Sequence, residues 1–529
     1  MAAIVDAGPS RPGAAAGVPG PVPDTPLAAL QVIDRLTVGP PSLSANHLTM
    51  PYQVERDGAV YATALTYRYE EPVFDPGAPG DRNLAAMIGV QVALNYGLFC
   101  REIVFQGPFD GHDRRFIADM MENTAREIYV LKFLQPNPFL TGPARELPVL
   151  RRRTYSQARV RFSDPEPDRI GPHWKAVAGR CAVSASGGKD SLLTHGIMAE
   201  LGFEVHSIFG NESGRHWFTA VNAFRHFRRT SPHTGRVWMN SDRLFSWMLR
   251  HLPFVRPDFA RVRSDEYPIR LWTVAVFLFG LLPLLRRRGI PWLLVGDEYD
   301  TTWPGEYKGI THYSGLYDQS RNFDDAMSDY YRRKGWGVAQ FSILRPMAEL
   351  LIMRTLARRY PELQAEQVSC HASHEDGGRM RPCGKCEKCR RIVAMLTAVG
   401  GDPARCGYTP EQVAAAIAEL PRRTLHQESA GSRHLMWMLA RQGVVNRDDF
   451  ADGAIQKHPE ILKLRFHPER SPVDGIPAEL RVPLYGLLLG EAGGAVRYNG
   501  QEWVPFDPVG VSGPRRARAG EPQNRRRKM

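Results

Sequence analysis

Residues 180–191 read RCAVSASGGKDS, an apolar run followed by a Gly-Gly turn and a polar helix start. The run 180–185 predicts a buried strand. Residues 191–201 predict a helix, with apolar residues every three or four positions and Gly202 as its stop. Backbone N–H groups at such a turn, together with the positive end of the helix dipole, favour phosphate binding. The stretch therefore predicts a phosphate site at a strand-to-helix turn.

Strands and helices continue to alternate after this motif. We predict strands at 204–209, 235–239 and 290–295, and a buried helix over the apolar run 271–285. This alternation indicates an α/β fold with a doubly wound parallel sheet. Ligands bind such sheets at the carboxyl ends of the strands, where the Gly-Gly loop and residues 296–298 are expected to lie.

The chain is long enough for several units. Its 529 residues exceed the roughly 250–300 that one hydrophobic core serves. Patterns at 61–69, 84–98 and 112–131 predict a strand and two helices before the phosphate loop. We divide the chain into a disordered segment 1–26, an N-terminal α+β domain 27–150, the α/β domain 176–365, a cysteine cluster 366–400, a small helical C-terminal unit 401–510 and a basic disordered tail 511–529.

Charge and hydropathy limit the possible partners. The net charge is +12, and residues 513–529 supply half of it, with seven Lys or Arg against one Glu. Such a tail can bind nucleic acid, but terminal basic runs are mostly solvated, so we do not expect nucleic acid as a partner. The apolar run 271–285 is shorter than the ~20 residues that cross a bilayer. With no secretion signal at the start, we expect a cytoplasmic protein without a membrane partner.

The loop side chains suit a nucleotide. Lys189 can neutralise phosphate charge, Asp190 can hold Mg2+ or orient the phosphates, and the Ser186 and Ser191 hydroxyls can donate to phosphate oxygens. The loop is not a Walker A motif, because Asp follows Lys189 and the first glycine of that motif is missing. Transfer of the γ-phosphoryl group is therefore disfavoured.

As a whole, residues 186–191 resemble the signature of the PP-loop, or N-type ATP pyrophosphatase, superfamily. The resemblance implies the adenine nucleotide alpha hydrolase-like fold, cleavage of ATP to AMP and pyrophosphate, and an adenylated intermediate. It implies ATP binding by the loop and by the ends of the first two strands: Ser184, Ser186, Gly187, Gly188, Lys189, Asp190, Ser191, Phe209 and Gly210. We take Lys189 and Asp190 as catalytic candidates.

Cysteines form a second motif. Twelve residues separate Cys370 from Cys383, and two residues lie between each of the next pairs, Cys383 to Cys386 and Cys386 to Cys389. Four thiolates in this spacing are typical of a tetrahedral Zn2+ site, and a site filled by four protein ligands is structural. In a reducing compartment this interpretation is favoured over disulfides.

Other candidates lie near the expected binding edge. Asp297 and Glu298 directly follow a strand and can hold Mg2+ on the pyrophosphate or act as a base, although loop acids are common there. A polar aromatic stretch is either a surface loop or a substrate contact. Arg345 can clamp a carboxylate or pair with Glu349. The substrate-binding candidates are His312, Tyr313, Gln319 and Arg345.

Two PP-loop families share these features. The loop and cysteine cluster, within residues 176–400, resemble the 7-cyano-7-deazaguanine synthases. The overall plan resembles the glutamate epimerase that acts on UDP-N-acetylmuramoyl-peptide, with a leading domain, the loop, an acidic strand end and the segment Ser342-Ile-Leu-Arg345-Pro346. The second resemblance implies ATP-dependent epimerisation of a peptidoglycan precursor, a nucleotide-sugar peptide. The alternatives are an amide- or nitrile-forming ligase acting on a small molecule and a zinc-stabilised RNA-binding module.

Overall fold

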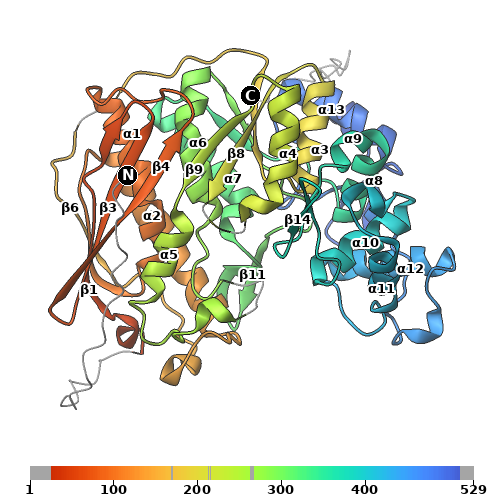
Figure 1. The fold of residues 1–529 in the computed structure, drawn as a ribbon, viewed down its shortest axis with the longest axis horizontal. Helices are drawn as coiled ribbons and strands as arrows, with labels where there is room; N and C mark the ends of the chain where they lie inside the picture. Colours follow the sequence, from red (N-terminus) through yellow and green to blue (C-terminus); the bar gives the residue numbers. More distant parts are fainter. Residues whose placement is uncertain (1–25, 168–170, 213, 215, 263–266, 513–529) are drawn as a thin grey trace, which may run out of the picture.

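The computed structural model describes residues 26–512 apart from 168–170, 213, 215 and 263–266 (Figure 1). The predicted disordered segment 1–26 and basic tail 511–529 lie outside the described residues, except for residues 26, 511 and 512. One sheet of eleven strands runs through the described chain in the order β13-β10-β7-β8-β9-β4-β3-β1-β5-β6, with β2 paired to β3.

The half of the sheet that carries the Gly-Gly loop is parallel. Pairs β13–β10, β10–β7, β7–β8 and β8–β9 all run in the same direction. The predicted strands 180–185 and 235–239 are confirmed, and the predicted strands 204–209 and 290–295 differ only at their ends. The bounds are β7 Arg180–Ala185, β8 Glu204–Glu212, β9 Gly235–Met239, β10 Trp292–Leu294 and β13 Ala339–Phe341.

The N-terminal strands extend this same sheet. Strand β4 runs antiparallel to β9, with Tyr67 opposite Met239. The expected N-terminal α+β unit thus shares a continuous sheet with the α/β unit, and the edge of the parallel half at β9 is covered rather than open. Its bounds are β1 Ile33–Val38, β2 Ser42–Ser44, β3 His47–Arg56, β4 Ala59–Tyr69, β5 Cys100–Phe105 and β6 Arg159–Phe162.

Helices cover both faces of the parallel half, since alternate strand residues enter two different cores. Ala182 and Ile208 face one core, and Val183 and Phe209 face the other. The first core receives α1 Pro79–Val90, α2 Gly111–Ile128, α5 Ser241–Leu249, α6 Val274–Arg288 and α7 Arg321–Lys334. The second receives α3 Lys189–Glu200, α4 His216–Thr230 and α8 Glu349–Arg359. The α/β class with a large, mostly parallel sheet is confirmed.

The apolar helix α6 begins at a buried carboxylate. Asp318 Oδ2 accepts the N–H groups of Thr273, Val274 and Ala275 at 2.7, 2.6 and 3.1 Å. These groups would otherwise lack partners in the first turn of the helix. Burial raises the pKa of Asp318 to about 7, against the effect of the three N–H groups. The carboxyl therefore fixes the start of α6 beside the cavity described below.

The C-terminal region adds a third core and a small sheet. Helices α10 Glu387–Val399, α11 Pro410–Ala418 and α12 Ser429–Arg441 form the third core, and Thr409 caps α11 with Gln412 in the expected capping box. The helical prediction missed three short strands here, β16 Leu464–Phe466, β17 Ala495–Tyr498 and β18 Trp503–Pro505. The remaining elements are α9 Pro361–Gln364, α13 Ala478–Glu491, α14 Pro508–Ser512 and the hairpins β11 Pro304–Tyr307 with β12 Ile310–Tyr313 and β14 His374–Asp376 with β15 Arg379–Arg381.

A helix must be both long and apolar to span a membrane. Across the described ranges, none of the helices is both long and apolar enough to span a bilayer. The predicted helix 271–285 is α6, which starts three residues later and carries Pro283 in its interior.

Candidate functional site

The Gly-Gly loop connects β7 to α3 in a tight backbone turn. Gly187 has φ of +75°, and a Cβ there would lie 2.5 Å from the carbonyl oxygen of Thr219. Only glycine fits this position. The Ser186 N–H donates to Ser191 Oγ at 3.2 Å, and this hydroxyl donates to the Gly188 carbonyl at 3.2 Å. The loop is thus closed onto the first turn of α3.

A cavity of about 480 Å3 lies at this loop. Its lining includes Ser184, Ser186, Gly188, Lys189, Asp190, Ser191 and Gly210, seven of the nine residues predicted to bind ATP. Gly187 underlies the loop, and Phe209 is buried in the second core instead. Strand alternation explains the difference, because Phe209 and Gly210 point to opposite faces of β8.

Gly296, which the sequence placed at the binding edge of the sheet, forms part of the cavity wall. Gly296 follows β10 and lines the cavity. A Cβ on it would lie 2.8 Å from Asp190 Cβ and 3.2 Å from the Ser191 nitrogen. The end of β10 therefore lies directly against the start of α3.

Lys189 lies among carboxylates. Its Nζ is 2.9 Å from Asp190 Oδ1, 3.0 Å from Glu298 Oε2 and 3.3 Å from Glu349 Oε1, and its side chain is only 8% exposed. Burial raises the pKa of Glu298, although Lys189 opposes that shift. The ammonium thus holds an acidic cluster together at the edge of the cavity, with the Asp190 carboxylate as its most exposed member.

Arg345 forms ion pairs with Asp324 and Asp297 and not with Glu349, the expected partner. Its Nη2 lies 2.5 Å from Asp324 Oδ2 and 3.3 Å from Asp297 Oδ2, and no ion pair with Glu349 forms within the described structure. Asp297 lines the cavity, and burial raises its pKa. Arg345 therefore positions Asp297 from behind and does not itself line the cavity.

Of the other three predicted substrate contacts, one lines the cavity and two do not. Gln319 lines the cavity, whereas His312 and Tyr313 are not among its lining residues. Tyr313 donates its N–H to the buried Glu127 at 2.8 Å, and His312 Nδ1 lies 2.7 Å from the Tyr313 carbonyl oxygen. These two residues belong to the β12 hairpin, which packs on α2.

Part of the cavity wall consists of residues that the sequence did not reveal. His216, Tyr267, His371, Lys388 and Arg391 line it. Tyr267 Oη lies 2.8 Å from His216 Nε2. Burial, aided by the nearby Arg270 and Lys388, lowers the pKa of His216 to about 4, so the imidazole is neutral at pH 7. Neither a shared motif nor periodicity connects these segments in the sequence.

Cations on this wall come from α10. Arg391 Nε is 3.7 Å from Glu349 Oε1 and 3.8 Å from Glu387 Oε1. Lys388 is half-buried, and the part of the chain that the structure describes offers it no ion-pair partner. The wall therefore presents an ammonium whose charge is not balanced by a carboxylate.

The four predicted cysteine ligands converge. Their sulfurs lie within 4.8 Å of one another, with Cys386 3.6 Å from Cys370 and 3.5 Å from Cys389, and Cys383 3.8 Å from Cys389. A tetrahedron with Zn–S bonds of about 2.3 Å separates its sulfurs by about 3.8 Å. The geometry fits Zn2+, and α10 starts directly after Cys386.

Comparison with known proteins does not place the chain in a family. No protein-family model matches it, and no curated protein matches it. Its functional assignment therefore depends on the loop, the cavity and the side chains around them.

Proposed function

We propose that this protein is an ATP pyrophosphatase that adenylates a substrate carboxylate and releases pyrophosphate. The observation that carries the proposal is the position of the glycine loop. It lines a large cavity together with an acidic cluster and with Lys388, which has no ion-pair partner among the described residues. This arrangement suits a nucleotide polyphosphate on one side and an anionic acceptor on the other.

The loop side would hold the phosphates and their metal. The first turn of α3 offers backbone N–H groups, and Ser186 and Ser191 add hydroxyls. The Asp190 and Asp297 carboxylates line the same cavity and are the oxygen ligands that Mg2+ prefers. Bound Mg2+ would supply charge neutralisation for the leaving pyrophosphate.

Lys388 and the residues around it would orient the acceptor. Lys388 can hold a carboxylate near the α-phosphorus of ATP. One carboxylate oxygen then forms a bond to that phosphorus while the bond to the β-phosphate oxygen breaks, giving an acyl adenylate and pyrophosphate. The four-cysteine cluster would hold a structural Zn2+ at the start of α10, which carries Lys388.

We further propose that the acyl group is the glutamate of a UDP-N-acetylmuramoyl-peptide, which the enzyme epimerises. Adenylation removes the negative charge of the carboxylate and acidifies the neighbouring C–H. A neutral base must then accept that proton, and His216 is neutral, lines the cavity and is hydrogen-bonded to Tyr267. Reprotonation on the other face and release of AMP by water complete the inversion.

Product analysis tests the first half of the reaction. With labelled ATP and UDP-N-acetylmuramoyl-L-alanyl-L-glutamate, the expected products are AMP and pyrophosphate. Asp190→Asn or Ser191→Ala should remove most of the turnover, whereas Ser163→Ala, an exposed serine outside the cavity, should not. Stoichiometric ADP and phosphate would refute the proposal.

Solvent exchange tests the second half. Epimerisation in D2O must place deuterium on the glutamate α-carbon without any nitrogen donor, because the proton that leaves one face is replaced from solvent on the other. If the peptide returns unlabelled while a carboxy-deazaguanine with ammonium drives AMP release, the protein is an amide- or nitrile-forming ligase instead.

A further inference from the structure

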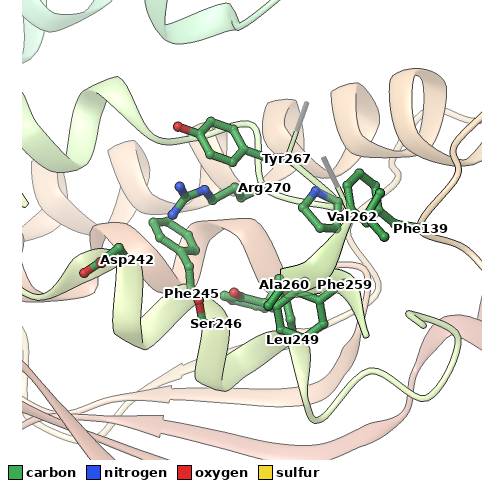
Figure 2. A pocket seen from close by; sticks show the side chains of 12 residues that line it. Phe139, Asp242, Phe245, Ser246, Leu249, Phe259, Ala260, Val262, Tyr267 and Arg270 are labelled. Atoms are coloured by element: carbon green, nitrogen blue, oxygen red, sulfur yellow. The ribbon is translucent and has the colours of Figure 1, made fainter. Parts of the chain in front are cut away.

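A second cavity adjoins the first. Its volume is about 210 Å3, and it is lined by residues of α5 and of the segments 259–262 and 267–270 (Figure 2). Tyr267 lines both cavities, so the two meet at this side chain. A molecule that contacts Tyr267 in the first cavity therefore lies beside the second cavity.

A cation that forms no ion pair with the described residues lies in this second cavity. The Arg270 guanidinium carbon is 3.8 Å from the ring centroid of Tyr267 and 4.4 Å from that of Phe245, and Figure 2 shows it between the two rings. Arg270 is half-buried and makes no ion pair with a carboxylate of the described residues. Two rings thus fix the guanidinium while its N–H groups remain available to a ligand.

Several other half-buried arginines of the described residues are paired with a carboxylate. Arg286 forms an ion pair with Asp81, and Arg288 forms one with Glu71. A cation that is partly withdrawn from water is unfavourable without a counter-charge. Arg354 and Arg390 also lack an ion pair among the described residues, but each donates to a backbone carbonyl. Within the same residues Arg270 has neither kind of partner, which points to an anion supplied by a ligand.

Two carboxyls near Arg270 limit the positive potential there. Glu212 is buried and accepts a hydrogen bond from Ser241 Oγ at 2.7 Å, and Arg270 opposes the rise of its pKa that burial causes. Asp242 lines the same cavity. An anion would therefore depend on direct bonds from the guanidinium, because no broad positive surface surrounds it.

The rest of the cavity is aromatic and aliphatic. Phe139, Phe259, Leu249 and Val262 line it beyond the guanidinium (Figure 2). Flat rings pack well against aromatic side chains. The cavity thus combines one anion-binding group with an apolar compartment for a planar ring.

We infer that this second cavity binds a nucleoside phosphate group, with the phosphate on Arg270 and the base against Phe259 and Phe139. The inference deepens the proposed function, and it rests on that function where it identifies the bound group as part of the acceptor. Because the cavity opens beside Tyr267, the nucleoside phosphate would be the far end of the acceptor whose carboxylate is adenylated in the first cavity. The acceptor is then an anion at both ends.

Calorimetric titration of the full chain with UDP tests the site. The titrations use saturating α,β-methylene-ATP with Mg2+ to fill the first cavity, and uridine and inorganic pyrophosphate serve as partial ligands. UDP should bind the wild type more tightly than either. Arg270→Leu should weaken UDP binding at least about tenfold, as expected for lost charge-assisted hydrogen bonds. Arg270→Lys, which keeps the charge, should fall between, and Arg250→Leu, at an exposed arginine that ends α5, should bind like the wild type.

The inference would be overturned if UDP does not bind the wild type, binds Arg270→Leu with unchanged affinity, or is displaced by the ATP analogue. Equal thermal unfolding midpoints of the wild type and Arg270→Lys show that the comparison is between folded proteins. The titration repeated without the analogue does not depend on ATP chemistry. If the wild type forms ADP yet UDP binding still requires Arg270, only the proposed function fails.

Discussion

Replacing Lys189 by Met should expose how the acidic cluster is held. In the wild type, one buried ammonium lies within 3.3 Å of oxygens of Asp190, Glu298 and Glu349. Methionine keeps most of the volume but leaves these carboxylates facing one another in a buried site. Removing one partner of a buried ion pair lowers the free energy of unfolding by about 3–5 kcal/mol, and we expect this range at pH 8.

The destabilisation should depend on pH with a definite sign. Lys189 lowers the pKa of both Glu298 and Glu349, so both folded-state pKa values should rise in Lys189→Met. A carboxyl whose folded-state pKa has risen loses stability as the pH rises, so the destabilisation should be greater at high pH. At pH 5 the loss should be smaller by at least about 1.4 kcal/mol, the equivalent of one pKa unit.

Urea unfolding followed by tryptophan fluorescence at pH 5 and pH 8 measures both values. The double variant Lys189→Met with Glu298→Gln, which removes one of the opposing charges, should recover part of the stability at pH 8. A loss below about 1 kcal/mol, or an equal loss at both pH values, would refute the reasoning.

Three further changes test other parts of the structure. Gly187→Ala should weaken ATP binding and should lower the unfolding free energy more than Gly202→Ala does. Both glycines have positive φ, which costs an alanine about 1–2 kcal/mol, but only the Cβ at Gly187 meets a carbonyl oxygen. Equal losses of unfolding free energy would contradict this. The purified protein should contain about one equivalent of zinc by elemental analysis. Cys386→Ser should lose the zinc and on the order of 10 kcal/mol of folding free energy, whereas Cys406→Ser, outside the cluster, should keep the metal. A folded and active metal-free protein would rule out the zinc site. Because the pKa of Asp318 is raised to about 7, the unfolding free energy of the wild type should fall by about 1.4 kcal/mol more than that of Asp318→Asn between pH 6 and pH 8; parallel pH profiles would show that this carboxyl does not titrate there.

Local patterns in the sequence were sufficient for the core of the fold. The run 180–185, the Gly-Gly turn and the following helix appear almost where expected, since each depends on neighbouring residues alone. The joining of the N-terminal strands to the parallel half was not predictable in this way. It depends on the pairing of β4 with β9, whose residues Tyr67 and Met239 are far apart in the sequence.

The same limit explains the errors in the candidate site. Arg345 and Gln319 were singled out as substrate contacts, and the cavity includes only Gln319 because two acidic side chains bind the guanidinium. The backbone N–H of Tyr313 donates to Glu127, 186 residues earlier in the chain, and this bond holds the segment outside the cavity lining. Composition indicates that such residues are polar and aromatic, but long-range partners decide where they point.

The position of the cysteine cluster at the start of α10 connects it to the cavity. Cys389 lies in the first turn of α10, and Lys388 and Arg391 on that turn line the cavity. A metal bound to Cys389 would fix the rotation of the helix about its axis, and with it the direction in which both cations point. It does so without touching a reactant. Loss of zinc should therefore weaken binding of the anionic acceptor together with stability. It should also affect the Gly-Gly loop, because the Gly187 carbonyl accepts the N–H of Val368, two residues before Cys370.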